Sequence, residues 1–298
     1  MKILYTGSNG LLGQKISIAT PQYPQHEFLA TSRGENRTQG MGTASYTAMD
    51  ITDRADVMRV VQAFQPDVII HGAAMTHVDQ CELHPEQATL MNVEGTRNMA
   101  EAAQQVGAHL VHISTDFIFD GKDGPYKEEA EPNPVSHYGW TKLEAERIVT
   151  ALDRFSILRT VLVIGMAEDL SRSNIVLWAK GALEKGDPIN VVDDQFRTPT
   201  LAEDLAQGAL LAADQRAQGI FNISGPDYMS IYELVAQVAA HFNLSMDTVT
   251  RVDSTTLNQP AKRPPITGFD ISKAREVLGY KPHTFKEALE IIAKQAGL

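Results

Sequence analysis

Short apolar runs alternate with amphipathic stretches through the first half of the chain. The runs have the length of strands and carry few polar residues, which is typical of parallel strands buried on both faces. They predict strands at Lys2–Thr6, Glu27–Ser32, Asp67–His71, His109–Ser114 and Phe155–Val163. Between them, the helical period predicts helices at Leu11–Ala19, from Thr52 or Asp53 to about Phe64, from Pro85 to about Val106, and around Tyr138 and Lys142. This alternation predicts an α/β fold, a Rossmann doubly wound parallel sheet with right-handed crossovers.

The pattern loosens after about Gly165, where the predicted elements become shorter and less regular. Helices are expected at Asn174–Lys185, Thr200–Ala213, Ser230–Asn243 and Ser272–Leu278, short strands at Ile189–Val192 and Gly219–Ile223, and proline-rich turns at Gln259–Pro265. We therefore predict a dinucleotide-binding Rossmann domain over residues 1–165, which the chain rejoins in part near 190–225. A smaller C-terminal substrate-binding region is predicted over residues 166–298.

Composition excludes several kinds of partner. With 43% apolar residues the chain is an ordinary globular protein, and its net charge of −11, without a basic run, argues against nucleic acid. The first residues read directly into a strand, and no apolar run reaches the roughly 18 residues of a membrane span, so we expect a cytoplasmic protein without a membrane partner. The single cysteine, Cys81, excludes an internal disulfide. His71, His77 and His84 lack the spacing of a zinc motif, and no metal is expected.

A glycine-rich turn joins the first predicted strand to the first helix. Gly7, Gly10 and Gly13 have the spacing GxxGxxG. In such a turn the first glycine allows the tight bend, the next lets the backbone approach a pyrophosphate, and the last lets helix and sheet pack closely. The helix N-terminus then presents N–H groups to the anion. The predicted cofactor contacts of this turn are Gly7, Asn9, Gly10, Leu11, Leu12 and Gly13.

The second strand indicates which dinucleotide is bound. An NAD site places an acid about 20 residues after the glycines, where it accepts from the ribose 2′-hydroxyl. Here that place holds Ser32 and Arg33, followed by Arg37. A guanidinium binds a 2′-phosphate that a carboxylate would repel, so the sequence favours NADP(H) over NAD(H). Asp50 and Ile51 stand where an acid could accept from the adenine amino group, with helix capping as the alternative role for Asp50.

Tyr138 and Lys142 lie four residues apart on a predicted helix and therefore face the same way. A tyrosine with the ordinary pKa near 10 needs its anion stabilised before it can protonate a carbonyl oxygen at neutral pH and be reloaded. The Lys142 ammonium can supply that charge and can also bond the nicotinamide ribose. A hydroxyl at the end of the fourth strand, at Ser114 or Thr115, would complete the group around a substrate oxygen.

The glycine triplet, the block STDFIFDG (residues 114–121) and the block YGWTK (138–142) resemble the extended short-chain dehydrogenase/reductases. Within them the chain is most similar, nearly end to end, to the dTDP-4-dehydrorhamnose reductases. The resemblance implies an NADPH-dependent reductase of a nucleotide-linked 4-keto-6-deoxy sugar. It implies that Thr115 orients the substrate carbonyl, that Tyr138 donates the proton and that Lys142 lowers the pKa of Tyr138. Other implied cofactor contacts are Ala73, Ala74 and Asn92, and implied substrate contacts are Thr76, Val78, Thr115, Phe117, Arg197 and Arg263.

Some residues depart from the pattern of that family. Phe117 replaces a tyrosine, Leu162 replaces a tryptophan expected to pack on the sugar, and Lys15 replaces a glutamate that some members use for magnesium. These changes spare the hydride chemistry and alter the sugar pocket. Two alternatives stay open: an NAD(P)-dependent sugar-nucleotide epimerase or dehydratase, and a non-catalytic NADP-binding regulatory subunit like that of methionine adenosyltransferase, which resembles the same reductases. The oligomeric state, including a homodimer, is also open.

Overall fold

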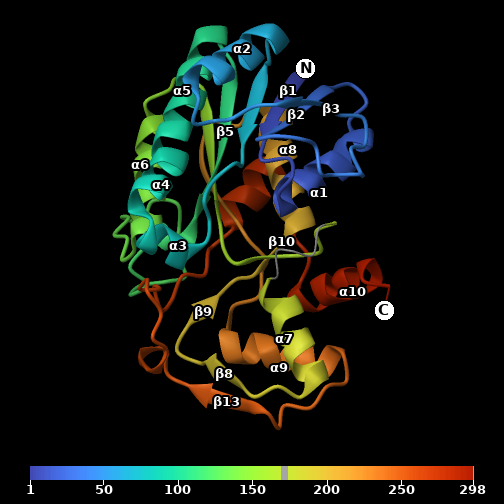
Figure 1. Ribbon diagram of the computed structural model, residues 1–298, viewed down its shortest axis with the longest axis vertical. Helices are drawn as coiled ribbons and strands as arrows, with labels where there is room; N and C mark the ends of the chain where they lie inside the picture. Colours follow the sequence, from blue (N-terminus) through green and yellow to red (C-terminus); the bar gives the residue numbers. More distant parts are fainter. Residues whose placement is uncertain (169–173, 298) are drawn as a thin grey trace.

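Seven parallel strands form the central sheet, in the order β11–β6–β5–β4–β1–β2–β3 (Figure 1). The computed structural model describes residues 1–168 and 174–297. The strands are β1 (Lys2–Thr6), β2 (Glu27–Ser32), β3 (Ser45–Ala48), β4 (Val68–His71), β5 (His109–Thr115), β6 (Phe155–Thr160) and β11 (Gly219–Ile223). From β1 the chain adds β2 and β3 on one side of the sheet. It then crosses back to add β4 on the other side of β1, followed outwards by β5, β6 and β11. This reversal is the switch point of a doubly wound Rossmann sheet, where such folds bind ligands.

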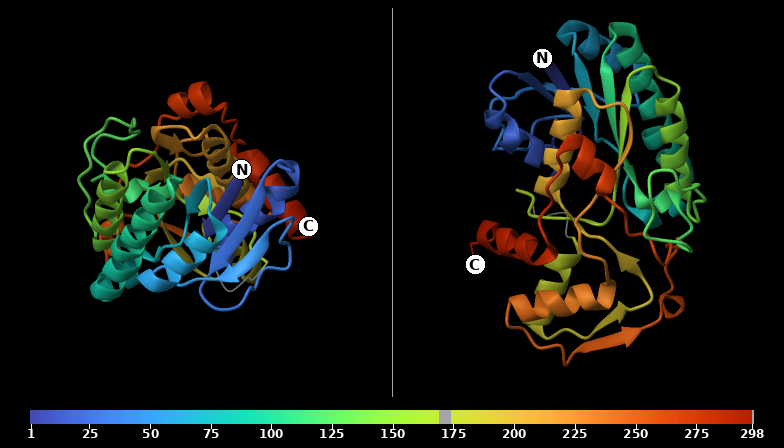
Figure 2. Two further views of the ribbon diagram at one scale, coloured as in Figure 1. Left: turned by 90° about the horizontal axis from the view of Figure 1, so that it is seen from above. Right: turned by 180° about the vertical axis from the view of Figure 1, so that it is seen from behind.

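Helices cover both faces of the sheet (Figures 1 and 2). One face carries α1 (Leu11–Ala19) and α8 (Ala202–Gln215), and the other carries α2 (Arg54–Phe64), α5 (Gly95–Val106) and α6 (His137–Thr150). Alternation along the strands explains the two layers. Ile3 and Tyr5 of β1 belong to the core cluster that includes α1 and α8, whereas Leu4 belongs to the cluster with α2, α5 and α6. Because both faces are buried, the central strands carry mostly apolar residues.

A smaller group of elements lies beyond the carboxyl ends of the strands, in the lower part of Figure 1. Helices α7 (Ile175–Lys185), α9 (Ile231–His241) and α10 (Phe285–Gln295) share a third core cluster, which includes Leu183, Leu234 and Leu289. Short strand pairs complete the group: β7 (Val163–Ile164) with β10 (Thr200–Leu201), β8 (Ile189–Val192) with β13 (Val249–Val252), and β9 (Phe196–Arg197) with β12 (Met229–Ser230). The remaining short elements are α3 (Val78–Leu83), α4 (Pro85–Thr89), π turns at Leu90–Glu94 and Ala274–Leu278, and 3-10 turns at Thr20–Gln22, Asp116–Ile118 and Ser254–Thr256.

Several elements differ from the sequence expectation. Strands β3 and β13 and helices α3 and α10 are present but were absent from it. Strand β3 is a partly exposed edge strand, so it lacks the apolar run that marked the other strands. Helix α10 did carry a readable signal, since Thr284 and Glu287 form a capping box at its N-terminus.

Two predicted elements are divided in the structure. The helix expected from Pro85 to about Val106 is α4, a π turn and α5. The strand expected over Phe155–Val163 ends at Thr160, and Val163–Ile164 pairs instead with β10. Between them Leu162 has φ +36, a left-handed conformation that is uncommon for a residue with a side chain. The chain therefore leaves the sheet at the rim of the switch point. None of the helices in residues 1–168 and 174–297 combines the length and apolar character needed to cross a bilayer.

Candidate active site

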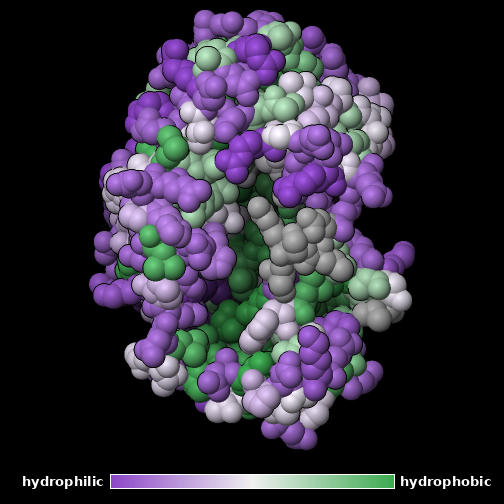
Figure 3. Space-filling model, in the orientation of Figure 1, coloured by the Kyte–Doolittle hydropathy of each residue, from purple (hydrophilic) through white to green (hydrophobic). Residues whose placement is uncertain are grey.

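A cavity of about 710 Å³ lies at the carboxyl ends of β1, β2, β4, β5 and β6. Figure 3 shows this face hollowed between the sheet and the smaller group of elements, with hydrophobic residues inside the hollow. The volume is in the range of ordinary cofactor and small-molecule sites. One continuous wall therefore contains the predicted cofactor end and the predicted catalytic end.

The glycine turn forms the part of the wall beside β1. Gly7 has φ +77, and the Gly10 N–H donates to the Gly7 carbonyl oxygen at 2.8 Å. A Cβ atom at Gly13 would lie 2.5 Å from both the Gly7 carbonyl oxygen and the Ser8 Cα, so only glycine fits there. Helix α1 begins at Leu11 with no acidic residue in its first turn. Its N–H groups can therefore receive a pyrophosphate, and all the predicted contacts of this turn line the cavity.

Two exposed arginines stand at the far end of the cavity, after β2. Ser32, Arg33 and Arg37 all line the wall. Asn9 holds the loop that carries the arginines, because its side chain donates to the Glu35 carbonyl at 3.0 Å and accepts from the Arg37 N–H at 2.9 Å. Ser32, Arg33 and Arg37 are thus held beside the glycine turn, where a 2′-phosphate would need a cation.

Asp50 and Ile51 line the same end of the cavity. One Asp50 carboxylate oxygen accepts from the Thr52 N–H at 2.9 Å and the Thr52 hydroxyl at 2.8 Å. Helix α2 is capped by Asp53, which accepts from the N–H groups of Ala55 and Asp56. Asp53 is therefore the N-cap of α2, and Asp50 stabilises the turn that precedes the helix.

Backbone after β4 forms the floor. Ala73 and Ala74 line the cavity. The Thr6 hydroxyl accepts from the Ala73 N–H at 3.0 Å and lies 2.9 Å from Nδ1 of His71. Asn92 does not line the cavity. Its side chain accepts from the Met75 N–H at 2.7 Å and donates to the Met75 carbonyl at 3.0 Å. The geometry therefore does not favour the predicted contact of Asn92 with the cofactor. Asn92 instead lies behind the cavity wall and holds the Met75 backbone in place.

Helix α6 brings Tyr138 to the wall opposite the glycine turn. Ser136 caps the helix by accepting from the Gly139 N–H at 3.3 Å, and a Cβ at Gly139 would lie 2.1 Å from the Phe117 carbonyl oxygen. The absence of a side chain at Gly139 lets α6 approach the end of β5, where Thr115 stands. Burial raises the pKa of Tyr138 well above 10, while a hydrogen bond with Thr115 acts to lower it. The phenol is therefore protonated at neutral pH.

Lys142 lines the cavity one turn after Tyr138. Its Nζ donates to the Ile113 carbonyl oxygen at 2.8 Å and lies 3.1 Å from Nε2 of His112. Burial lowers the pKa of Lys142 to about 8, with Glu146 acting in the opposite direction. The hydrogen bonds described for Nζ thus lead to β5 and not to the Tyr138 hydroxyl. The effect of Lys142 on Tyr138 that the resemblance implied thus needs a different position of the ammonium.

The predicted substrate contacts divide into two groups. Thr76, Val78, Thr115, Phe117 and Arg263 line the cavity. Phe117 packs edge-on against the Tyr138 ring, with ring centroids 5.6 Å apart. Both terminal nitrogens of Arg263 donate hydrogen bonds to the Asp79 carboxylate, at 3.1 and 2.9 Å. This pair links the C-terminal half of the protein to α3.

Arg197 lies behind the wall instead of on it. Its terminal nitrogens donate to the carbonyl oxygens of Phe196, Pro265 and Pro264 at 2.7, 2.9 and 2.7 Å. Its Nε lies 3.7 Å from a carboxylate oxygen of Asp116. Direct contact with a substrate does not fit this burial, and Arg197 joins the two halves of the molecule instead.

Several further residues on the wall are absent from the predicted site residues, among them Met91, Asp116 and Leu162. Met91 lies in the π turn, and Leu162 has the positive φ, so neither follows from a regular pattern. Asp116 was readable because it follows Thr115 directly. Lys15, at the position of the family's magnesium-binding glutamate, pairs with Glu203 at 2.8 Å and joins α1 to α8.

The chain matches the model of one protein family, the RmlD substrate binding domain, over residues 1–297. Methionine adenosyltransferase 2 subunit beta from Xenopus tropicalis is 34% identical over 249 residues, which cover 82% of this chain and 72% of that protein. A solved dTDP-4-dehydrorhamnose reductase from Clostridium acetobutylicum has a TM-score of 0.86 and 32% identity, covering 100% of both chains. The dTDP-4-dehydrorhamnose reductase from Bacillus anthracis, solved in complex with NADP, has a TM-score of 0.84 and 28% identity, covering 99% of each chain.

Proposed function

This chain belongs to the RmlD substrate-binding family, and we propose that it is an NADPH-dependent reductase of a nucleotide-linked 4-keto-6-deoxy sugar, similar to dTDP-4-dehydrorhamnose reductase. One observation carries the proposal: Thr115, Tyr138 and Lys142 line the same cavity as the glycine turn. A retained acid, its hydroxyl partner and a cation beside a dinucleotide cradle form the set that carbonyl reduction requires.

Tyr138 is the proton donor in this proposal. Burial raises the pKa of Tyr138 and keeps its phenol protonated, so donation to the ketone oxygen requires that the phenolate be stabilised as it forms. Bound NADPH supplies the hydride to C4 of the sugar. The ketone becomes an alcohol, and Tyr138 is left as a phenolate that regains its proton from solvent. Lys142 can stabilise that anion if its ammonium leaves the Ile113 carbonyl oxygen, and its depressed pKa indicates an imperfectly stabilised cation.

NADP(H) is the proposed cofactor, with NAD(H) second. A Cβ atom at Gly13 would clash with the backbone of Gly7 and Ser8, so the tightly packed turn that would receive the pyrophosphate requires glycine there. Ser32, Arg33 and Arg37 would hold the 2′-phosphate, and Asp50 and Ile51 would contact the adenine. The Bacillus anthracis reductase, which was solved with NADP, supports the same choice.

The sugar nucleotide would occupy the opposite end of the cavity. Thr76, Val78, Phe117 and Arg263 would contact it, while Thr115 orients its carbonyl. We propose that residues 1–165, with a return near 190–225, form the dinucleotide-binding domain and also supply four of these sugar contacts, and that residues 166–298 form the smaller substrate-binding region, to which Arg263 belongs. We also propose a cytoplasmic location, since NADPH is an intracellular reductant. A homodimer remains a hypothesis that light scattering of the purified protein tests directly.

A second candidate function is a regulatory subunit. The 34% identity to methionine adenosyltransferase 2 subunit beta favours it. In that role the chain would bind NADP and a catalytic partner without reducing a sugar. The retained Thr115, Tyr138 and Lys142 support the reductase instead, because cofactor-dependent assembly does not require a proton donor.

The test is an NADPH-oxidation assay against a panel of nucleotide-linked 4-keto-6-deoxy sugars, followed at 340 nm. We expect stoichiometric loss of NADPH with at least one of them and a product reduced at C4. Tight NADP binding without oxidation on any sugar would contradict the reductase. An isomerised product without net oxidation would indicate the epimerase alternative.

A further inference from the structure

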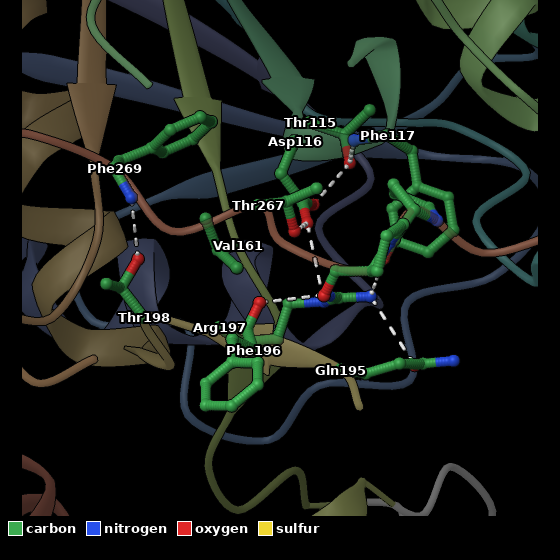
Figure 4. Close-up of polar contacts among 12 residues, drawn as sticks. Thr115, Asp116, Phe117, Val161, Gln195, Phe196, Arg197, Thr198, Thr267 and Phe269 are labelled. Atoms are coloured by element: carbon green, nitrogen blue, oxygen red, sulfur yellow. Dashed lines mark hydrogen bonds and ion pairs between the residues drawn. The ribbon is translucent and has the colours of Figure 1, made fainter. Parts of the chain in front are cut away.

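A buried network of polar side chains joins the catalytic end of the cavity to the C-terminal half of the protein. Asp116 is its centre (Figure 4). One carboxylate oxygen accepts from the Thr115 hydroxyl at 3.1 Å, and the other accepts from the Thr267 hydroxyl and lies 3.7 Å from Nε of Arg197. Asp116 is 2% exposed and Arg197 is 4% exposed. Thr267 and Asp116 are 151 residues apart in sequence, yet their side chains meet here.

The number of protons and lone pairs on the Thr115 hydroxyl determines which groups of this network donate and which accept. A threonine hydroxyl has one proton to donate and two lone pairs to accept. The proton goes to Asp116 at 3.1 Å, and one lone pair accepts from the Phe117 N–H at 3.2 Å. Thr115 also acts on the pKa of Tyr138, so the orientation of its hydroxyl bears on the catalytic phenol. The Thr115 proton therefore points to the Asp116 carboxylate, and its lone pairs are left for the backbone and the catalytic end of the cavity.

Arg197 is fixed independently of the carboxylate it faces. Three backbone carbonyl oxygens, those of Phe196, Pro264 and Pro265, hold its terminal nitrogens, and Figure 4 shows part of this cradle. A buried carboxylate without a nearby cation would be strongly disfavoured as an anion. Burial raises the pKa of Asp116, and Arg197 and Thr267 act against that shift while they hold the carboxylate in place.

We propose that Asp116 is a positioning residue that sets the orientation of the Thr115 hydroxyl, and through it Tyr138, and that Arg197 and Thr267 make this orientation depend on the C-terminal half. The inference rests on the proposed reductase function. It assigns to Arg197 a role in alignment in place of substrate contact.

The test is a double-mutant cycle on kcat with Thr115→Val and Asp116→Asn, using NADPH and whichever keto sugar the wild type reduces. Thr115→Val should lower kcat by on the order of 10²-fold, because a hydroxyl that positions the reacting groups is lost. Asp116→Asn should lower kcat roughly tenfold, the equivalent of about one hydrogen bond to a charged group. If Asp116 acts through Thr115, the double variant should be no slower than Thr115→Val alone. Losses that multiply to about 10³-fold would overturn the inference.

Two further variants distinguish an effect on the orientation of Thr115 from a purely structural link between the two halves of the molecule. Thr267→Val keeps the carboxylate, Arg197 and Thr115 but removes one hydrogen bond to Asp116. We expect a several-fold lower kcat with KM for the sugar and NADPH affinity unchanged. The matched control is Thr198→Val, which is equally buried and loses only its bond from the Phe269 N–H at 3.2 Å. A structural role alone would lower the melting temperature of both variants and leave both kcat values unchanged.

The outcomes for the inference and for the proposed function are distinguishable. A wild type that oxidises NADPH with no sugar in the panel overturns the proposed function, and this inference with it. An active wild type with multiplying losses, or with Thr267→Val no slower than Thr198→Val, overturns only the role of Asp116.

Discussion

The two ends of the cavity are built in different ways. The cofactor end is mostly backbone: the glycine turn, the N-terminus of α1 and the floor at Ala73, all close in space because consecutive βα units place them there. The sugar end is made of side chains from distant segments, such as Phe117 from the end of β5 and Arg263 paired with Asp79 on α3. A backbone cradle tolerates few changes and serves one ligand class, whereas a side-chain pocket can be altered without loss of the fold.

The comparison predicts the largest effect where the two ends meet, at Tyr138. Tyr138→Phe should lower kcat by about 10²- to 10⁴-fold, the range of general acid–base catalysis, because the phenylalanine ring fills the same space without a proton to donate. NADPH affinity, measured by fluorescence titration, should change little. Tyr23→Phe, on a half-buried tyrosine outside the cavity lining, is the matched control. Activity that survives in Tyr138→Phe would sink the assignment of the acid.

Arg33 tests the cofactor end. Arg33→Gln should weaken NADPH binding by roughly 10- to 100-fold, because a hydrogen-bonded charge pair with the 2′-phosphate is lost. NADH lacks that phosphate, and its affinity should not fall. Arg147→Gln removes an exposed arginine on α6 and serves as the control. Equal losses for both cofactors would place the 2′-phosphate elsewhere, and Arg37 would be the next residue to change.

Gly13 tests whether the cradle depends on backbone approach. Gly13→Ala would put a Cβ 2.5 Å from backbone atoms of Gly7 and Ser8. We expect a destabilisation of about 1–3 kcal/mol by urea unfolding and weaker NADPH binding. Gly181 is the control, because a Cβ there meets nothing within 4 Å and the residue lies within α7. Gly181→Ala should be neutral or stabilise the protein by up to about 1 kcal/mol.

The smallest effect concerns the pH dependence of stability at Lys142. Its pKa is lowered to about 8 in the folded protein, against an ordinary value of 10.5. Between these two pKa values Lys142 binds more protons in the unfolded chain than in the folded protein, so it makes the free energy of unfolding rise with pH. Below about pH 8 Lys142 is charged in both states, and the full cost of burying its charge destabilises the folded protein. Lys142→Met should therefore be more stable than the wild type at pH 7, and the difference should narrow towards pH 10.

That prediction is measured by urea unfolding at a series of pH values on the cofactor-free protein. Lys185→Met, on a lysine at the last turn of α7, is the control and should show no such pH trend. A constant difference between Lys142→Met and wild type across pH 7–10 would mean that Lys142 keeps an ordinary pKa. Loss of reductase activity in Lys142→Met, despite greater stability, would fit a residue retained for function.

Much of the fold followed from pattern because the main strands are buried on both faces. The phosphate turn and the Tyr138–Lys142 pair depend on local spacing, and the structure brings them to one cavity as the βα order requires. Edge strand β3 escaped prediction because half of it faces solvent, and α10 was missed although its capping box was visible at Thr284 and Glu287. The sugar end was predicted only through the resemblance, and there Arg197 proved to lie behind the wall.

By itself the sequence determined the doubly wound sheet, and it predicted where a dinucleotide would bind and which side chains would react. Each of these depends on residues within a turn or two of one another, where geometry follows from the helical and strand periods. Only the tertiary structure decided that Lys142 faces the Ile113 carbonyl oxygen, that Arg197 supports Asp116 and that Leu162 turns into the cavity. Those contacts join segments tens of residues apart, and their partners are set by packing of the whole chain, which no local period records.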